Sequence, residues 1–132
     1  KLLRLKSSVH GTMTIVANIS GHTEPLGGRK LEDIARGAVK FGLADAVCLA
    51  GTTAGSEIAE DDLKSARAGA EGVAVVAGTG VRTSNVERML ALADGVIMGT
   101  SIKVDGNTFN PVDPARAKEF IARARDVRAQ YK

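Results

Sequence analysis

The sequence is poor in aromatic residues and in cysteine. Its 132 residues include three Phe, one Tyr and no Trp, so a buried core must be built from aliphatic side chains. The single cysteine, Cys48, lies within an apolar run and has no partner for an internal disulfide. This pattern predicts a buried structural thiol in a reducing, cytoplasmic compartment. Two histidines without a His-x-His or Cys pair cannot form a zinc cage. Asp105 or Glu24 could hold a magnesium ion that bridges a phosphate, but nothing in the sequence requires it, and we expect no metal and no cofactor.

Signals for membranes and nucleic acids are also missing. No apolar run reaches the roughly 18 residues of a membrane-spanning helix, and no signal peptide is evident. The net charge is only +3, and much of the excess lies in the last segment, "ARAKEFIARARDVRAQYK". Acidic residues are interleaved with basic ones elsewhere in the chain, and this segment holds only two aromatic residues, Phe120 and Tyr131, which favours a solvated helix face over nucleic-acid binding. The chain begins at Lys1 rather than Met, so we expect a piece of a longer protein.

Glycine, by contrast, is abundant, with 15 residues that mostly follow apolar runs. Three runs end alike, in "CLAGTTAG" (48–55), "VVAGTGV" (75–81) and "VIMGTS" (96–101). Each of these buried strands therefore ends in the same kinds of group, the bare backbone of glycine and the hydroxyl of threonine or serine. We therefore expect the three strand ends to share one place in the fold.

Apolar periodicity predicts alternating strands and helices within a single domain, residues 1–132. After an amphipathic helix over 2–9, strands are expected at 12–20, 44–51, 73–78 and 95–99, and helices at 28–42, 60–72, 84–95 and 113–130. Gly42 is a natural helix stop, Ser84 and Glu87 have capping-box spacing, and Asp113-Pro114 is a typical helix start. Strands that are apolar on both faces predict a parallel α/β sheet. An open doubly wound sheet and part of a (β/α)8 barrel both fit this order.

The motifs favour the barrel. A dinucleotide-binding loop needs a third glycine where "GTGVRT" has Thr83, and the next strand ends without a carboxylate. No G-K-[ST] sequence is present, which excludes a Walker P-loop. In (β/α)8 barrels the loops after the last two strands commonly hold a phosphate. The two last loops here have the composition that such a site requires.

The predicted phosphate site draws on both loops. Glycine lets backbone N–H groups approach an anion, hydroxyls donate hydrogen bonds, and a lysine adds charge. The expected ligand-binding residues are Gly78, Thr79, Gly80, Val81, Gly99, Thr100, Ser101 and Lys103. The alternative is that these residues only serve strand-to-helix turns, which also favour Gly, Ser and Thr.

Candidate acid–base groups follow the first strand. His22 has a side chain whose ordinary pKa suits proton transfer near neutral pH, or it is a loop histidine bonded to backbone. Glu24 is a second catalytic candidate or a solvated charge, and Asn18 at the strand end either orients a ligand or satisfies a turn. None of the expected strands contains a lysine, which argues against Schiff-base chemistry. The residues alone leave open whether the protein is an enzyme.

The segments "PLGGR", "ADGVIMGTS" and "NPVDP", in this order, resemble the BtpA/SgcQ family, named for photosystem I biogenesis proteins. The resemblance covers nearly the whole chain. It implies a TIM barrel of roughly twice this length, with the present chain matching the C-terminal half, strands five to eight. It also implies an alternative function, that of a non-catalytic assembly or stability factor for photosystem I-type complexes. Where members often carry an acidic residue after strand five, this sequence has Asn18.

A half barrel has open edges on its first and last strands. A second copy, the missing N-terminal half or a flattened sheet would each resolve this, and we expect closure by a partner, in the form of a homo-oligomer. The function predicted from the loops is that of an enzyme, or former enzyme, of undefined reaction that binds a phosphorylated small molecule, such as a sugar phosphate or a nucleotide.

Overall fold

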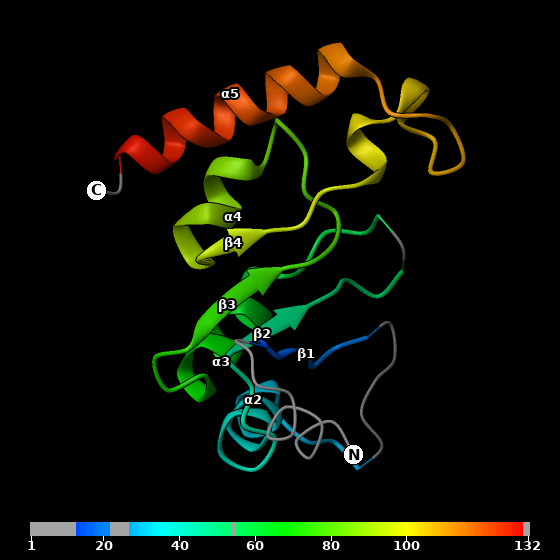
Figure 1. Cartoon of the computed structure of the whole chain (residues 1–132). Coiled ribbons are helices and arrows are strands. Elements are labelled where there is room, and N and C mark those ends of the chain that lie inside the picture. Colours follow the sequence, from blue (N-terminus) through cyan, green and yellow to red (C-terminus); the bar gives the residue numbers. More distant parts are fainter. Residues whose placement is uncertain (1–12, 22–26, 54, 131–132) are drawn as a thin grey trace.

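The computed structural model describes residues 13–21, 27–53 and 55–130 (Figure 1). The predicted helix over 2–9 lies outside this part of the chain. The strands are β1 (Val16–Asn18), β2 (Ala46–Leu49), β3 (Ala74–Ala77) and β4 (Gly95–Val96). The helices are α2 (Leu31–Lys40), α3 (Glu60–Gly69), α4 (Val86–Leu92) and α5 (Pro114–Gln130), and two short 3-10 turns, η1 (Thr100–Ile102) and η2 (Val104–Gly106), follow β4. The strands form one parallel sheet in the order β1-β2-β3-β4, which confirms four consecutive βα units.

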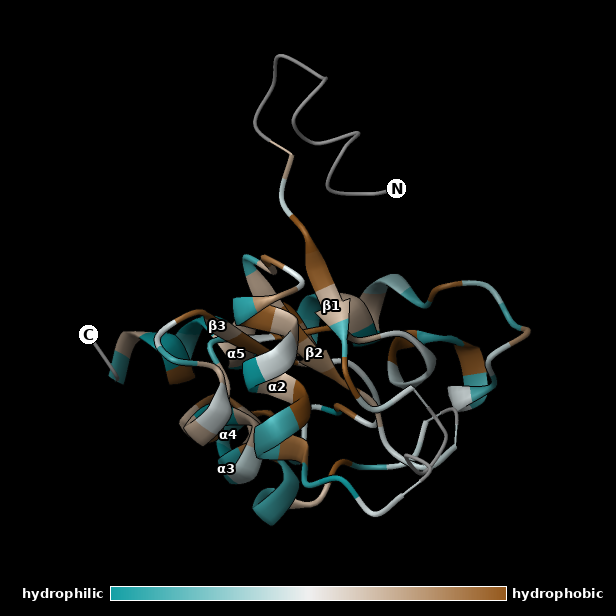
Figure 2. Cartoon of the chain, turned by 90° about the horizontal axis from the view of Figure 1, so that it is seen from below, coloured by the Kyte–Doolittle hydropathy of each residue, from teal (hydrophilic) through white to brown (hydrophobic). Residues whose placement is uncertain are grey.

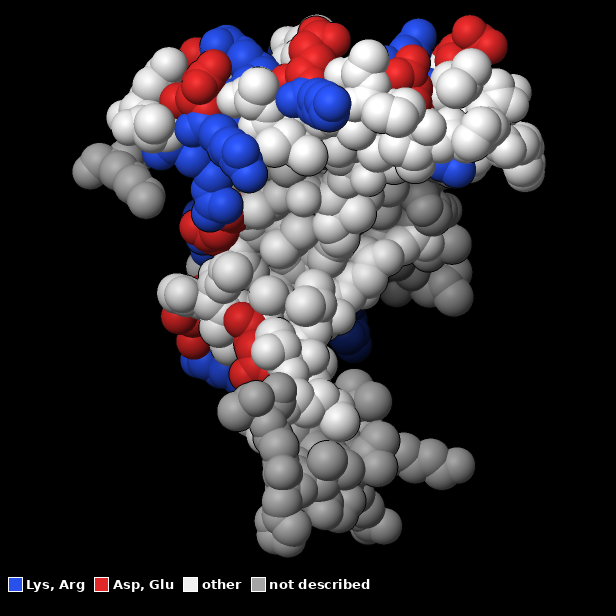
Figure 3. All heavy atoms as spheres, turned by 45° about the horizontal axis from the view of Figure 1, so that its top comes forward, with Lys and Arg blue, Asp and Glu red and all other residues white. Residues whose placement is uncertain are grey.

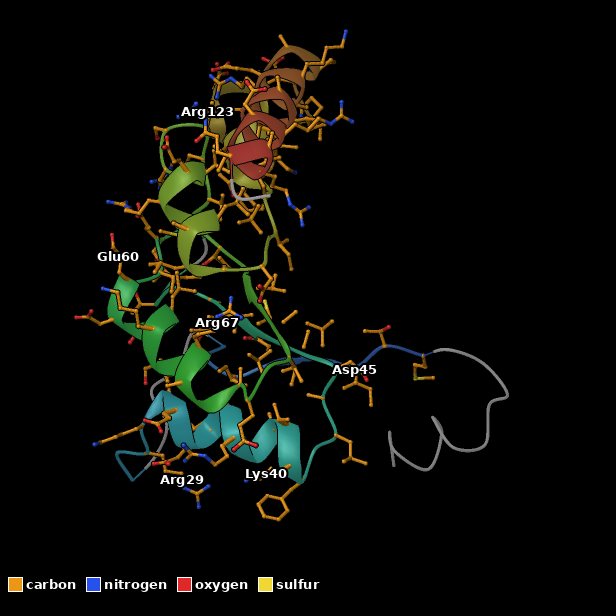
Figure 4. All side chains as sticks on the ribbon, turned by 90° about the vertical axis from the view of Figure 1, so that its left-hand side faces the viewer. Arg29, Lys40, Asp45, Glu60, Arg67 and Arg123 are labelled. Atoms are coloured by element: carbon orange, nitrogen blue, oxygen red, sulfur yellow. The ribbon has the colours of Figure 1, made fainter. Side chains whose placement is uncertain are left out.

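Helices α2, α3 and α4 pack on one face of the sheet, and in Figure 4 α3 and α4 lie on one side of the ribbon and the strands on the other, whereas α5 packs against α4 and η1. Alternate strand residues point toward them because successive side chains of a strand face opposite ways. Val47, Leu49 and Val75 are fully buried there. They pack in one cluster with helix residues that include Leu63, Ala66, Val86 and Met89. This aliphatic layer is the core that the scarcity of aromatic residues predicted.

The opposite face of the sheet carries no helix in the described part of the chain. The side chains on this face are those of Val16 on β1 and of the residues level with it on the other strands, such as Ala46 on β2. Val16 and Ile97, at the two edges of this face, are each 52% exposed. Figure 2 shows the apolar character of β1, which forms one edge of the sheet.

Ion pairs join successive helices on the outer surface (Figure 4). Lys40 of α2 lies 3.2 Å from Glu71, and Arg88 of α4 lies 3.5 Å from Glu60 of α3. Arg123 of α5 pairs with Glu87 of α4. These side chains are about half exposed, so each pair contributes at most about 1 kcal/mol to stability.

Of the predicted helix boundaries, the start of α5 is confirmed, whereas the start of α4 and the end of α2 differ in detail. Asp113 caps α5, because its Oδ1 accepts hydrogen bonds from the N–H groups of Ala115 (2.8 Å) and Arg116 (3.3 Å). The predicted capping box at Ser84 is wrong: α4 begins at Val86, and Asn85 precedes it without a side-chain cap. Asn85 instead closes the preceding turn by accepting the N–H of Arg82 (2.8 Å) and donating to the carbonyl of Gly80 (3.0 Å).

The other differences concern the last residues of helix α2 and of strand β4. After α2 the left-handed residue is Leu43, with φ 49°, and not Gly42. Gly42 is needed for a different reason, since a Cβ there would lie 2.5 Å from the Ala38 carbonyl oxygen. Strand β4 spans Gly95–Val96 instead of 95–99, because the chain turns into η1 soon after Ile97 donates to the Ala77 carbonyl (2.8 Å). Over the described residues, no helix combines the length and apolar character that a bilayer crossing needs.

Candidate functional site

A hollow of about 590 Å³ opens at the carboxyl ends of β3 and β4. Both loops that follow these strands contribute to its wall. The lining residues are Gly55, Gly78, Thr79, Gly80, Val81, Arg82, Thr83, Ser84, Ile97, Gly99, Thr100, Ser101, Gly106 and Arg116. The structure therefore brings together all of the sequence-predicted phosphate residues except Lys103.

Close packing against the neighbouring loop shapes the β3 side of the hollow. Gly80 has φ +69°, and a Cβ there would lie 2.3 Å from the Ser56 carbonyl oxygen. A Cβ on Gly78 would lie 2.7 Å from the Cys48 sulfur. Thr79 Oγ1 accepts the N–H of Gly51 (2.6 Å) and donates to the Ser56 carbonyl (3.1 Å). These glycines and this hydroxyl hold the two loops together.

The loop after β4 is held by its own hydroxyls and by Lys103. Ser101 Oγ donates to the Val81 carbonyl (2.8 Å), and the hydroxyls of Thr100 and Thr108 are 2.9 Å apart. Lys103 Nζ donates to the Thr108 carbonyl (2.7 Å), which directs its charge away from the lining. The Ser101 proton is therefore committed within the protein, although its oxygen can still accept.

Backbone N–H groups remain as donors around the hollow. Within the described ranges, nothing accepts a hydrogen bond from the N–H groups of Gly80, Val81, Gly99, Thr100 or Ser101. Among the described glycines of the lining, Gly99 is the one where a Cβ would meet no atom within 4 Å, so its bare backbone faces open space. Successive free N–H groups of this kind form concavities that attract anions.

Two arginines give the hollow its charge. Arg82 and Arg116 are among its lining residues, and no aspartate or glutamate of the described part of the chain is. Arg82 Nη2 donates to the Gly55 carbonyl (3.1 Å), and its nearest carboxylate oxygen, on Glu57, is 3.9 Å away. Arg116 lies 3.6 Å from Asp113. Sequence reasoning missed both arginines, although Arg82 lies in the "GTGVRT" segment that it had singled out.

The acid–base candidates are not gathered at this hollow. His22 and Glu24 lie outside the described residues. Asn18 is exposed at the end of β1, where its Oδ1 accepts a long hydrogen bond from the Ser20 N–H (3.4 Å). Because β1 and β4 are opposite edges of the sheet, three strand spacings separate Asn18 from the β4 loop.

A second hollow, of about 780 Å³, lies beside the first turns of α2 and α3. Its lining includes both signs of charge, from Arg29, Lys30, Glu57 and Asp62. Mixed charge makes it less suited to an anion than the hollow after β3 and β4. No group of three or more His, Cys, Asp and Glu side chains that could hold a metal ion occurs among the residues that the structure describes.

Comparison with known proteins gives a consistent picture. A model of the BtpA family matches residues 1–126. The chain is 33% identical over 122 residues to the photosystem I biogenesis protein BtpA of Synechocystis sp., which covers 92% of the chain and 42% of that protein. It is 37% identical over 103 residues to the putative sgc region protein SgcQ of Escherichia coli, covering 78% of the chain and 38% of that protein. The chain thus spans less than half the length of these curated relatives.

Solved structures show the same fold. N-(5'-phosphoribosyl)anthranilate isomerase from Pyrococcus furiosus aligns with a TM-score of 0.58 at 19% identity, over 93% of this chain and 55% of that one. The phosphoribosyl anthranilate isomerase from Thermus thermophilus aligns with a TM-score of 0.61 at 16% identity, over 86% and 51%. At these identities the likeness establishes the fold alone. The chain forms about half of a TIM-barrel-like structure.

Proposed function

The chain belongs to the BtpA family, and from that premise we propose that it binds a phosphorylated small molecule in the hollow after β3 and β4. The observation that carries the proposal is the combination of five N–H groups without acceptors among the described residues, two arginines and a lining without carboxylates. A sugar phosphate or a nucleotide is the expected ligand class.

The chemistry of phosphate explains why this lining suits it. A phosphate group with two negative charges needs several donors to replace its hydration shell. Backbone N–H groups of Gly80, Val81, Gly99, Thr100 and Ser101 would supply directional donors without adding bulk. Arg82 and Arg116 would supply charge, and a guanidinium can bind two phosphate oxygens at once.

The residues of the site then divide into two groups. Gly78 and Thr79 shape the β3 loop, and Lys103 orders the β4 loop through Thr108, whereas the N–H groups and arginines contact the ligand. His22, Glu24 and Asn18 stay predictions for acid–base or orienting roles in a reaction that is not defined. The two isomerases named above act, by their names, on a phosphoribosyl compound, which is the same ligand class.

Calorimetry with inorganic phosphate, ribose 5-phosphate and adenosine monophosphate tests the proposal. We expect measurable binding heat and a raised melting temperature with at least one phosphate ester. Arg82→Gln and Arg116→Gln should each weaken binding by about tenfold, because a hydrogen bond to a charged group contributes about 1.5 kcal/mol or more. Arg125→Gln, on an exposed part of α5, is the matched control and should bind normally. Absence of heat and of thermal protection with all three ligands would refute the proposal.

A second candidate function is assembly of a larger complex without catalysis. The name of the Synechocystis relative states such a role for that protein. The observation that favours it here is Phe109, which is 96% exposed in the loop between η2 and α5. The double variant Thr100→Val with Ser101→Ala distinguishes the two functions. If it abolishes phosphate binding but still replaces the wild-type protein in the cell, the assembly role is favoured.

A further inference from the structure

Asn85 is the one polar or charged residue that is buried in the part of the chain that the structure describes, with 6% of its surface exposed. It directly precedes α4, at the end of the loop that leaves β3 (Figure 1). Its side-chain oxygen accepts the N–H of Arg82 at 2.8 Å, and its side-chain nitrogen donates to the carbonyl of Gly80 at 3.0 Å. Both polar atoms of this buried amide are therefore bound to a loop that lines the hollow.

The bond to Gly80 determines where a neighbouring donor points. A peptide unit is planar and trans, so its carbonyl and its N–H point in opposite directions. The carbonyl of Gly80 and the N–H of Val81 belong to one such unit. Because Asn85 binds the carbonyl, the N–H of Val81 points away from Asn85. Val81 lines the hollow, and nothing in the described ranges accepts a hydrogen bond from its N–H group.

The next peptide unit is held at both ends. Its carbonyl, on Val81, accepts the Ser101 hydroxyl at 2.8 Å, and its N–H, on Arg82, donates to Asn85 at 2.8 Å. The side chain of Val81 is packed in the core, with 3% of the residue exposed. Of the four polar groups in these two units, the described structure leaves the N–H of Val81 for a ligand.

Gly80 is the reason that this loop needs a clamp. Its φ is +69°, and glycine crosses between backbone conformations with little steric resistance. Without the bond from Asn85, the Gly80–Val81 peptide unit is free to turn over. A reversed unit would place the Gly80 carbonyl oxygen, with its partial negative charge, at the hollow in place of the Val81 N–H. An anion would then meet repulsion where it now meets a donor.

Long-range charge does not replace such a donor. Figure 3 shows lysine, arginine and acidic side chains mixed along the top of the molecule, where α5 lies, and not an unbroken basic surface. Fields from mixed charges largely cancel beyond a few ångströms in salt solution. The affinity for an anion therefore depends on the groups that line the hollow itself and on how they are oriented.

We propose that Asn85 is a positioning residue of the phosphate site, which holds the Gly80–Val81 peptide unit so that the Val81 N–H faces the anion. This inference rests on the proposed function. Asn85 is not a lining residue, so it acts on the ligand through the two peptide units that it binds. Preorganised backbone donors of this kind bind an anion without having to reorient when it arrives.

The variant Asn85→Ala tests the proposal by calorimetry with inorganic phosphate and ribose 5-phosphate. Affinity for both should fall about tenfold, the equivalent of one lost hydrogen bond to a charged group. Asn110→Ala is the matched control, because the Asn110 amide also donates to a loop carbonyl, that of Val104 at 3.0 Å, but neither residue lines the hollow. It should bind like the wild type. Wild-type affinity in a folded Asn85→Ala variant overturns the proposal.

A second control separates positioning from stability. Val127→Ala removes buried methyl groups on α5, outside the lining of the hollow, and should lower the melting temperature. Measured below the melting temperature of each variant, its affinity for phosphate should equal that of the wild type. If the affinity falls as much in Val127→Ala as in Asn85→Ala, lost stability explains the effect and the positioning role is overturned.

Nuclear magnetic resonance of the wild type tests the orientation without any variant. Titration with inorganic phosphate should move the Val81 amide proton downfield, because that proton gains an acceptor, whereas the side-chain amide protons of Asn85 should move little. A Val81 amide that is unchanged at saturating phosphate overturns the proposal even if Asn85→Ala does not fold. If the wild type binds none of the phosphate ligands, the proposed function fails and the role of Asn85 fails with it. If the wild type binds and Asn85→Ala binds equally well, the role of Asn85 fails alone.

Discussion

The Ser101 hydroxyl donates a 2.8 Å hydrogen bond to the carbonyl oxygen of Val81. The two residues lie in different loops, one after β4 and the other after β3, and both line the same hollow. This bond sets the relative position of the two rows of free N–H groups. A residue that sequence reasoning assigned to ligand donation therefore positions the loops that would hold the ligand.

Replacing Ser101 by alanine should loosen this connection. Ser101→Ala leaves the Val81 carbonyl without its donor, which costs about 0.5–1 kcal/mol at a partly exposed site. The melting temperature should fall by roughly 2–4 °C, and affinity for ribose 5-phosphate should fall with it. Ser84→Ala, at a lining residue whose hydroxyl makes no hydrogen bond in the described structure, is the control for thermal unfolding and should melt like the wild type.

Two glycines of the same hollow should respond differently to alanine. Gly80→Ala should destabilise the protein by about 2 kcal/mol or more, because φ is +69° and the new Cβ would lie 2.3 Å from the Ser56 carbonyl oxygen. Gly99→Ala meets no atom within 4 Å and should change stability by less than about 0.5 kcal/mol. Its methyl group would instead project into open space at the hollow and weaken phosphate binding. Urea unfolding with calorimetry distinguishes the two effects, and equal stability losses would contradict this assignment.

Asp94 should make stability depend on pH in the acid range. Burial opposes ionisation of this side chain, but hydrogen bonds from Arg67 (2.6 Å) and from the Val75 N–H (2.7 Å), with the charge of Arg67, outweigh it and lower the pKa of Asp94 below its ordinary value. Folding therefore favours the ionised carboxylate. The resulting stability is present above the unfolded-state pKa of about 3.9 and is lost as the pH falls through the folded-state pKa.

The substitution Asp94→Asn isolates this contribution. The variant should lose about 1 kcal/mol or less at pH 7, since the side chains of Arg67 and Asp94 are 41% and 49% exposed. Its free energy of unfolding should then fall less than that of the wild type between pH 5 and 3. Asp126→Asn, at an exposed position of α5, serves as control. If the free energy of unfolding falls equally for the wild type and Asp94→Asn between pH 5 and 3, Asp94 does not titrate as argued.

Cys48 should be a slow nucleophile. It is 8% exposed on β2, and burial raises the pKa of its thiol. Because the thiolate is the reactive form, iodoacetamide should modify the native chain at least about tenfold more slowly than the chain in 8 M urea at the same pH. Mass spectrometry of timed samples measures both rates. Equal rates would indicate that the β2 region opens readily in the native state.

The sequence predicted the fold well because its signals are local. Apolar runs separated by amphipathic segments specify strands and helices, and the start of α5 at Asp113 followed from one dipeptide. Element ends were less accurate, as with the cap at Asn85 and the short β4, because these ends depend on contacts with neighbouring loops. Seven of the fourteen residues that line the hollow were anticipated, since every βα unit of a parallel sheet delivers its loop to the same edge.

The sequence by itself determined that four parallel βα units form and that glycine-rich loops follow the last two strands. Only the tertiary structure decided which groups in those loops are available to a ligand. Thr79 and Ser101 donate their hydroxyl protons to neighbouring loops and Lys103 bonds to Thr108, while Arg82 and Arg116 line the hollow. The physical reason is that the hydrophobic periodicity that specifies a helix or strand is a property of one segment. Each of these donors, by contrast, finds its acceptor in another segment, between 5 and 23 residues away.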